Sequence, residues 1–525
     1  MEITTPLHYN TKVQIKIERC KKSIASKQLR ESKALFNDLD SFESKIESNL
    51  LPIYFLEMAE MYLQFSLQTR SYSDANKAIK YFEKIKIKFS SEEFHWKFLS
   101  GLANATFISF RLKKEHTIHK KHKKFIWNDD SIRLVQHSKK IFLELINEKY
   151  ENKNFPNSLF QDTLIGLSQL TADINRWSES FYYLGQTKSK NPDFSFYYIS
   201  TMIYNSFSSN VCSDEVNLPS YHKNIVYLSN LAIEHKETTP EYVEIILKMR
   251  QESLNQLNIK SIPMEELEEM KDIELKDFLK HTKYRQFILK NGLGISDHSI
   301  YCSCSLSGRD YFPLKNKHVR ETHKGDKLIL DKFQALIDQL ILSFSHARNC
   351  YYQASSNSFK NIHSKEFKFE LDSKQAIEDN LHIESFKSCY GILDKIALGL
   401  VDIYDTKTII SLNKVYFHSL FKAHNNLIYR KIFQESQSDY LVSLYSLSQD
   451  LGDNGALKEF KQWRNKIEHG LVFLSDDTTN DPRVNLSYVS HVIAREEFTN
   501  KLLLLLQLTR SAIFSFGYLL RRKSK

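Results

Sequence analysis

Glycine and proline are scarce in this sequence of 525 residues, which contains 13 Gly and 9 Pro. Both residue types interrupt helices and mark tight turns, so their scarcity predicts a chain made mostly of helices. Hydrophobic residues make up 42% of the chain and charged residues 26%, which is ordinary globular composition and excludes general disorder. The length exceeds that of a single hydrophobic core and predicts two or three domains. We therefore expect an all-α protein.

Cysteine is also sparse, and the six cysteines are scattered along the chain, as expected for free thiols in a reducing compartment. The N-terminal residues lack the uninterrupted apolar core of a signal peptide, so a cytoplasmic location is expected. The most apolar segment, Leu502 to Leu520, reaches membrane-spanning length, but Arg510 lies at its middle. Because a charge at the bilayer centre is costly, we expect a buried bundle helix and no membrane partner.

Signatures of nucleotide hydrolysis are missing from the sequence. Gly292-Leu293-Gly294 has neither the third glycine of a dinucleotide loop nor the Lys-Ser/Thr of a phosphate loop. Cys302 and Cys304, with His298 upstream, suggest a metal site, but a single Cys-x-Cys lacks the second ligand pair that a zinc site needs. We therefore predict no cofactor and no metal.

The formal net charge of +10 favours a polyanionic partner such as RNA. The strongest basic run extends from Arg111 to Lys124 and contains seven Lys/Arg and three His. Phe125 and Trp127 follow it, so the run could hold an RNA backbone while an aromatic ring stacks on a base. A solvated loop between two helices is the favoured alternative.

Residues 34–260 show the periodicity of successive short amphipathic helices, and residues 1–33 are expected to form a tail or a capping helix. Two of these helices resemble the second helix of a tetratricopeptide repeat. The matching positions are Ala78, Phe82 and Ile85 in one and Ser180, Leu184 and Thr187 in the other. The usual Trp and Gly of the first helix are missing, so we predict a tetratricopeptide-like α-solenoid that presents a concave face to a peptide or protein partner.

Residues 261–325 are predicted to be a linker or a small irregular subdomain, which begins with an acidic helix over Met264 to Lys280. Residues 326–525 are predicted to be a bundle of longer helices. Apolar stripes at i, i+3, i+4 spacing predict the first two helices of the bundle. The stripes comprise Phe333, Leu336, Ile337, Leu340, Ile341, Phe344, Ala347 and Tyr351, and then Phe386, Cys389, Leu393, Ala397, Leu400 and Tyr404. A shorter helix is expected over Tyr440 to Leu451, and the last helix from about Val492 to Leu520.

The penultimate helix of this bundle carries Arg464, Asn465 and His469, a combination that suits phosphodiester chemistry. Arginine is permanently charged and binds phosphate oxygens through a planar fork, while an unperturbed histidine titrates near pH 6.5. Asn465 and His469 share a helix face, but Arg464 lies about 140° from His469 on an ideal helix. For both groups to reach one phosphate, the helix must end or bend near Lys466, or a second copy must complete the site. Taken alone, such a pair is more often a solvated helix face.

The RNxxxH stretch from Arg464 to His469, the order of long helices and the closing apolar helix resemble a HEPN domain at residues 326–525. A HEPN domain after tetratricopeptide-like repeats resembles a bacterial toxin or antiphage architecture. The resemblance implies a metal-independent endoribonuclease that acts as a homodimer, with the two motifs facing each other across one site. His469 would be the acid/base group, Arg464 would bind the scissile phosphate, and Asn465 would orient the site.

Three lysines near the motif, Lys458, Lys461 and Lys466, are candidate contacts to flanking RNA phosphates. A third polar group often supports such sites, and the candidates are the stretch 345–349 and Glu384. Each of these is more simply interpreted as a solvated or core-edge residue. Some HEPN domains are inactive, so the alternative function is a non-catalytic helical-repeat scaffold or an RNA-binding adaptor.

Overall fold

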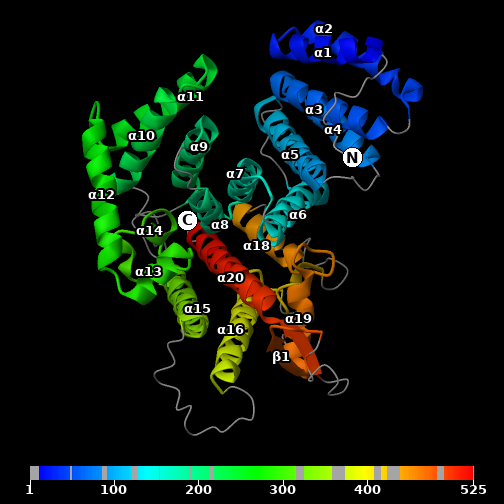
Figure 1. Ribbon diagram of the computed structural model, residues 1–525. Coiled ribbons are helices and arrows are strands. Elements are labelled where there is room, and N and C mark those ends of the chain that lie inside the picture. Colours follow the sequence, from blue (N-terminus) through cyan, green and yellow to red (C-terminus); the bar gives the residue numbers. More distant parts are fainter. Residues whose placement is uncertain are drawn as a thin grey trace. The chain divides into compact units, whose positions relative to one another are not determined.

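The structure is a computed structural model, and it describes most of the chain. The described residues are 11–47, 50–85, 92–120, 127–152, 154–187, 192–211, 218–314, 324–356, 373–406, 415–422, 438–479, 481 and 490–523. Helices account for nearly all of the regular structure in these residues, which confirms the predicted all-α class (Figure 1). The chain forms two compact units, Met1–Leu170 and Thr171–Lys525, and each is described by itself.

Unit 1 is a succession of helices. Its helices are α1 (Thr11–Ala25), α2 (Leu29–Asp40), α3 (Leu51–Thr69), α4 (Tyr72–Lys84), α5 (Glu92–Glu115), α6 (Asp129–Glu151) and the greater part of α7 (Asn157–Asp173). The helices from α1 to α6 pack against their neighbours along the chain, and α7 contacts α6 where Gly166 lies against the ring of Phe142. Aromatic rings fill the space between them, for example Phe36 stacked on Tyr62 with 4.1 Å between ring centroids. Gly101 of α5 lies against the ring of Phe82 from α4, so a side chain at Gly101 would collide with that ring.

The basic run after α5 is only partly described. Lys114 lies over the Trp127 ring, with 5.5 Å from Nζ to the ring centroid, and Trp127 is only 4% exposed. Because a buried ring cannot receive a nucleobase, the predicted stacking role fails for Trp127. Phe125 and the lysines at 121, 123 and 124 lie outside the described residues.

The first part of unit 2 contains a further series of helices, which continues through the residues predicted to be a linker. These are α8 (Trp177–Gln186), α9 (Phe194–Asn210), α10 (Pro219–Glu234), α11 (Pro240–Gln256), α12 (Met264–Lys280), α13 (Lys283–Lys290), the short α14 (His298–Tyr301) and the 3-10 turn η4 (Ser305–Gly308). The acidic helix expected over Met264 to Lys280 is α12, and irregular chain joins the short elements after it up to residue 314.

The second part of unit 2 is a bundle of long helices. It comprises α15 (Lys324–Ser356), α16 (Ser373–Ile403), α18 (Asp439–Asp450), α19 (Lys458–His469) and α20 (Arg495–Lys523), with a short turn η7 (Leu420–Lys422). Two five-residue strands, β1 (Leu471–Ser475) and β2 (Ser490–Ala494), pair in parallel between α19 and α20. The last helix therefore begins at Arg495 rather than near Val492, because the preceding residues belong to β2.

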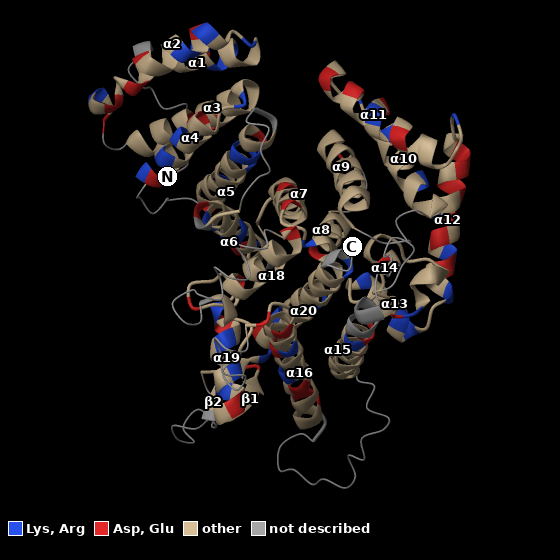
Figure 2. Ribbon diagram, turned by 180° about the vertical axis from the view of Figure 1, so that it is seen from behind, with Lys and Arg blue, Asp and Glu red and all other residues tan. Residues whose placement is uncertain are grey.

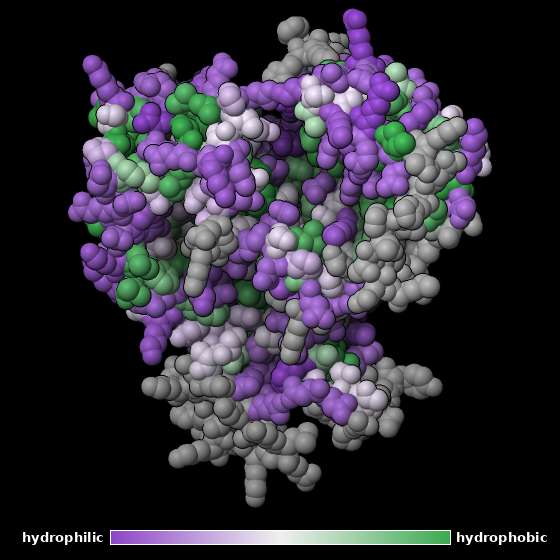
Figure 3. All heavy atoms as spheres, turned by 45° about the horizontal axis from the view of Figure 1, so that its top comes forward, coloured by the Kyte–Doolittle hydropathy of each residue, from purple (hydrophilic) through white to green (hydrophobic). Residues whose placement is uncertain are grey.

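Helix α20 lies among α8, α15, α16 and α18, as Figure 1 shows. Among the described residues, α20 is the one helix that is both long enough and apolar enough to cross a membrane. However, 89% of its most apolar stretch of 18 residues is buried inside the protein. Arg510 at its middle donates to the backbone carbonyls of Gly294, Ser178 and Ser299 at 2.7, 3.4 and 3.3 Å. These bonds compensate the buried cation, so α20 is a core helix of unit 2, as predicted. Hydrophilic residues cover most of the coloured surface on the face in Figure 3.

Buried ion pairs join the first part of unit 2 to the bundle. Arg176, at the start of α8, is completely buried and contacts Asp450 of α18 at 2.6 Å. Arg521 of α20 contacts Asp297 at 2.6 Å. Charged groups that are removed from water must be paired, so each contact fixes the relative position of the two elements that supply it.

Candidate functional site

The local sequence determines how α19 sits on the bundle. Phe460, Trp463 and Ile467 are its buried residues, and they follow the spacing of one helix face. Trp463 packs on Phe498 of α20 and Phe386 of α16, with ring centroids 5.1 and 6.3 Å apart. This apolar face leaves the charged residues of α19 on its other sides, and Figure 2 shows both basic (blue) and acidic (red) positions along this helix.

Helix α19 stays helical through the whole RNxxxH stretch. It ends at His469, and the N–H of Gly470 donates to the carbonyl of Lys466 at 2.9 Å. The helix therefore continues without a break past Lys466 to His469. Within one chain, Arg464 and His469 keep the angular separation of about 140° that an ideal helix gives them.

Arg464 is held against α16 and is only 11% exposed. Its Nη2 donates to Asp394 Oδ2 at 3.3 Å, and its Nε lies 3.1 Å from Glu468 Oε1. The guanidinium also lies over the ring of Tyr416, with 4.7 Å to the ring centroid. Such contacts fix the plane of the arginine fork, so this cation has a defined position before any ligand binds.

Asp394 is the main partner of Arg464, and the sequence analysis did not identify it. Its Oδ1 accepts the backbone N–H of Phe417 at 2.9 Å. Burial raises the pKa of this carboxyl group, while the N–H of Phe417 and the charge of Arg464 oppose the rise. In the sequence, Asp394 directly follows Leu393 of the apolar stripe. It also lies four residues after Tyr390, whose ring is near the Arg464 guanidinium, and this spacing is the one signal that could have identified Asp394.

The other motif residues are more accessible than Arg464. Asn465 and His469 are both exposed, and their spacing of four places them on one face of α19. Among the flanking lysines, Lys458 is exposed and Lys466 half-buried, while Lys461 forms an ion pair with Asp453 at 2.6 Å. Two of the three lysines therefore offer charge without a salt-bridge partner among the described residues.

The candidates for a third polar group make contacts of their own. Arg348 is buried and forms an ion pair with Asp310. His346 of α15 and Glu384 of α16 approach each other to 3.9 Å, and both are at least half exposed. Asp394 therefore takes the supporting position beside Arg464.

A second histidine lies near the end of α19. The parallel pairing of β1 and β2 places His491 opposite Val472, which follows His469 by three residues.

The electrostatics of the site are unusual for an anion-binding group, because two carboxylates face the single guanidinium of Arg464. Asp394 is 21% exposed and anchored by a backbone N–H, whereas Glu468 is 42% exposed and lies on the same helix as Arg464. An incoming phosphate would compete more readily with Glu468 than with Asp394, since an exposed ion pair on a helix is weak.

Comparison with known families supports this part of the chain as a HEPN domain. Residues 328–523 match the family model described as LA2681-like HEPN. The matched residues include α16, α18, α19, α20, the two strands and nearly all of α15, so they contain both Arg464 and His469. No curated protein and no solved structure matches the chain.

Proposed function

We propose that this chain is a metal-independent endoribonuclease whose active site is built from Arg464, Asn465 and His469. The observation that carries the proposal is the placement of the RNxxxH motif on α19, with an anchored arginine and an exposed histidine, inside the HEPN match. The positive net charge of the chain also favours an RNA substrate.

The chemistry follows from the properties of these side chains. The ribose 2′-OH attacks the neighbouring phosphorus, the P–O5′ bond breaks, and the products are a 2′,3′-cyclic phosphate and a 5′-hydroxyl. His469 moves the proton to or from the reacting oxygens. Arg464 stabilises the negative charge that grows on the phosphate oxygens in the transition state, and Asn465 orients the RNA. DNA lacks the 2′-OH and is not a substrate.

A homodimer resolves the geometry of the motif. Because α19 is one continuous helix through His469, one copy of the helix directs Arg464 toward α16 and leaves His469 exposed at its last turn. A second copy, facing the first, would supply the groups that one chain cannot bring to the same phosphate. In this arrangement Glu468 turns away from Arg464 when the phosphate arrives, while Asp394 keeps the guanidinium in place.

We further propose that the helices before the HEPN domain act as tetratricopeptide-like repeats. Ala78 of α4 and Ser180 of α8, two of the small residues that carry the resemblance, are both completely buried. Small buried residues allow close helix packing, as a helical-repeat array requires. Such an array would bind a protein or peptide trigger and control the nuclease, in a cytoplasmic toxin or antiphage system.

Expression of the full chain in bacteria tests the proposed activity. We expect the wild type to degrade cellular RNA and stop growth, and Arg464→Ala and His469→Ala to do neither. Arg133→Ala and His137→Ala are matched controls, since both residues are exposed on α6 and lie outside the HEPN match. Soluble yield and circular dichroism show whether each variant folds. Equal toxicity of all five proteins would refute the proposal.

The second candidate function is a non-catalytic scaffold or RNA-binding adaptor. The low exposure of Arg464 and its two carboxylate partners favour this alternative, because they also suit a purely structural ion pair. The same variants distinguish the two: an adaptor would keep its RNA binding in His469→Ala and would leave the RNA intact in every case.

A further inference from the structure

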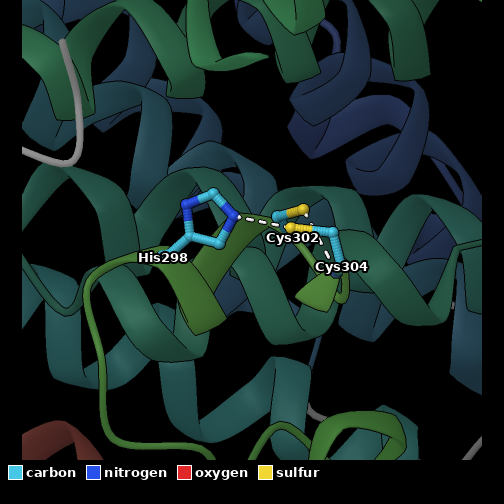
Figure 4. A group of neighbouring side chains, drawn as sticks. All are labelled: His298, Cys302 and Cys304. Carbon is cyan, nitrogen blue, oxygen red and sulfur yellow. Dashed lines mark hydrogen bonds between the residues drawn. The ribbon is translucent and has the colours of Figure 1, made fainter. Parts of the chain in front are cut away.

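His298, Cys302 and Cys304 converge in a small group at the end of α14. The His298 Nε2 lies 3.0 Å from the Sγ of Cys304, and this nitrogen and the two sulfur atoms all lie within 4.8 Å of one another. Figure 4 shows the imidazole ring pointing toward the two sulfur atoms. The single Cys-x-Cys of the sequence thus gains a third donor, because α14 turns His298 back onto it.

The histidine is held in an orientation that suits a metal ligand. His298 is 1% exposed, and its Nδ1 forms a hydrogen bond with the hydroxyl of Tyr301 at 2.8 Å. Tyr301 is fixed in turn by edge-on contact with the buried ring of Tyr221, with centroids 4.8 Å apart. A partner on one ring nitrogen fixes the imidazole and directs the other toward the ligand position, as in most protein sites with a metal-bound histidine.

The two cysteines are preorganised by the chain that joins them. The N–H of Cys304 donates to the Sγ of Cys302 at 3.3 Å, which folds the short loop so that both sulfur atoms face the same side. Glu274 of α12 accepts the N–H of Ser303 at 2.9 Å, so a carboxylate closes the neighbouring side of the loop. Both cysteines are partly exposed, which leaves a path for an ion from solvent.

We propose that His298, Cys302 and Cys304 bind a Zn²⁺ ion, with the fourth position filled by water or by the carboxylate of Glu274. Two thiolates and one imidazole are the donors that Zn²⁺ prefers among the common divalent ions. Binding releases the two thiol protons to solvent, and the two resulting negative charges balance the charge of the ion. Donor atoms on one tetrahedral zinc lie about 3.5–3.8 Å apart, given Zn–S and Zn–N bonds of about 2.3 and 2.0 Å. The observed donor atoms are separated by distances from 3.0 Å to at most 4.8 Å, so each separation needs to change by about 1 Å or less.

The position of this site gives the ion a structural role. Asp297, next to His298, accepts a hydrogen bond from Tyr518 and forms an ion pair with Arg521, and both residues belong to α20. The backbone carbonyl of Ser299 accepts a hydrogen bond from Arg510, which belongs to the same helix. A zinc ion would therefore brace the segment that packs against the closing helix of the HEPN match, and this role does not depend on ribonuclease activity.

Metal content and cobalt substitution test the site on the full chain, purified under reducing conditions and without RNA. We expect about one zinc per chain, in line with a dedicated structural site. Replacement by Co²⁺ should give a thiolate-to-metal absorption band and the strong visible bands of tetrahedral cobalt. Cys304→Ser should remove these bands and most of the zinc. The matched control is Cys350→Ser, because Cys350 also lies beside a histidine, with 3.7 Å to His346 Nε2.

Thermal unfolding supplies a second readout. A strong chelator should lower the melting temperature of the wild type and of Cys350→Ser, and leave that of Cys304→Ser unchanged. Reduced wild-type protein that carries no zinc and gives no thiolate band with Co²⁺ would overturn the inference, as would equal metal loss in the two serine variants. If Cys304→Ser fails to fold, the zinc content of the wild type and its titration with Co²⁺ decide whether the site binds a metal. These experiments do not measure RNA cleavage. A chain that binds no zinc could therefore still be a ribonuclease, and a chain that cuts no RNA could still bind zinc.

Discussion

Arg464 and Asp394 form an ion pair between α19 and α16, with 3.3 Å between Nη2 and Oδ2. The pair joins residues 70 positions apart and gives the motif arginine a fixed place on the bundle. A guanidinium that is already oriented loses little freedom when it binds phosphate, and preorganised charges of this kind supply much of the power of many active sites. The supporting carboxylate is thus part of the proposed site although it does not touch the RNA.

Replacement of Asp394 tests its positioning role. Asp394→Asn keeps the shape of the side chain but removes the charge that holds Arg464, so we expect the rate constant of RNA cleavage, kcat, to fall roughly tenfold, in line with lost orientation. KM should change much less. Steady-state kinetics on a defined RNA give both constants.

The control for this variant is Asp402→Asn on the same helix. Asp402 forms an ion pair with Lys332, which is 65% exposed, so its loss should leave kcat unchanged. If Asp402→Asn slows cleavage as much as Asp394→Asn does, the effect belongs to the stability of α16 and not to the orientation of Arg464.

Glu468 is expected to compete with the phosphate for Arg464. Glu468→Gln removes a carboxylate 3.1 Å from the Nε of Arg464 and should therefore lower KM for RNA several-fold, with kcat little changed. The salt dependence of RNA binding should become steeper, since one more cation is available to the phosphates. An unchanged or higher KM would show that Glu468 does not block the arginine.

Protonation of His382 should limit stability in acid. Burial, with the nearby charge of Arg495, lowers the pKa of this histidine to about 4, and neither ring nitrogen has a hydrogen-bond partner among the described residues. Above pH 6.5 the histidine is neutral in both states and has no effect. Between about pH 6.5 and pH 4 only the unfolded chain takes up the proton, so folding loses about 1.4 kcal/mol per pH unit and about 3 kcal/mol in all.

The variant His382→Leu removes this titration. We expect its free energy of unfolding to fall less than that of the wild type between pH 7 and pH 4, whereas His346→Leu, at an exposed position, should follow the wild type. Urea denaturation at a series of pH values gives the comparison. Parallel curves for His382→Leu and the wild type would mean that His382 titrates normally.

Arg176 should contribute strongly to the stability of unit 2. It is completely buried between Glu179 and Asp450, which are 2% and 3% exposed. Arg176→Met would leave two buried carboxylates without their cation, and breaking one partner of a buried pair typically costs about 3–5 kcal/mol. Hydrogen exchange of the α18 amides should accelerate accordingly. The exposed Arg133→Met should have almost no effect, and equally slow exchange in both variants would contradict the account.

The sequence was sufficient where a pattern is local. Helix α12 has the bounds Met264–Lys280 that its composition indicated, and α20 is a buried core helix despite Arg510. Periodicity and breakers act within a few turns, so a single segment contains the information that they carry. The shared helix face of Asn465 and His469 follows for the same reason from their spacing of four.

Features that depend on distant residues could not be predicted. Asp394 supports Arg464 only because α16 and α19 pack side by side, and Arg176 meets Asp450 across 274 positions of sequence. The strand pair β1 and β2 could not be predicted for the same reason. Each strand has only five residues and no strong sequence pattern of its own, so each is defined by its pairing with the other. The convergence of His298 with the two cysteines depends on a turn that spacing alone does not reveal.

The central claim is that His469 and Arg464 cut RNA by attack of the 2′-OH, and the chemistry of the cut ends tests it most directly. Purified wild type and His469→Ala are incubated with total RNA without added metal ions, at protein concentrations high enough for dimers, and the new ends are mapped. We predict 2′,3′-cyclic phosphate and 5′-hydroxyl ends that form with the wild type and are missing with His469→Ala. Identical ends and rates with both proteins, or no new ends with the wild type, would contradict the account.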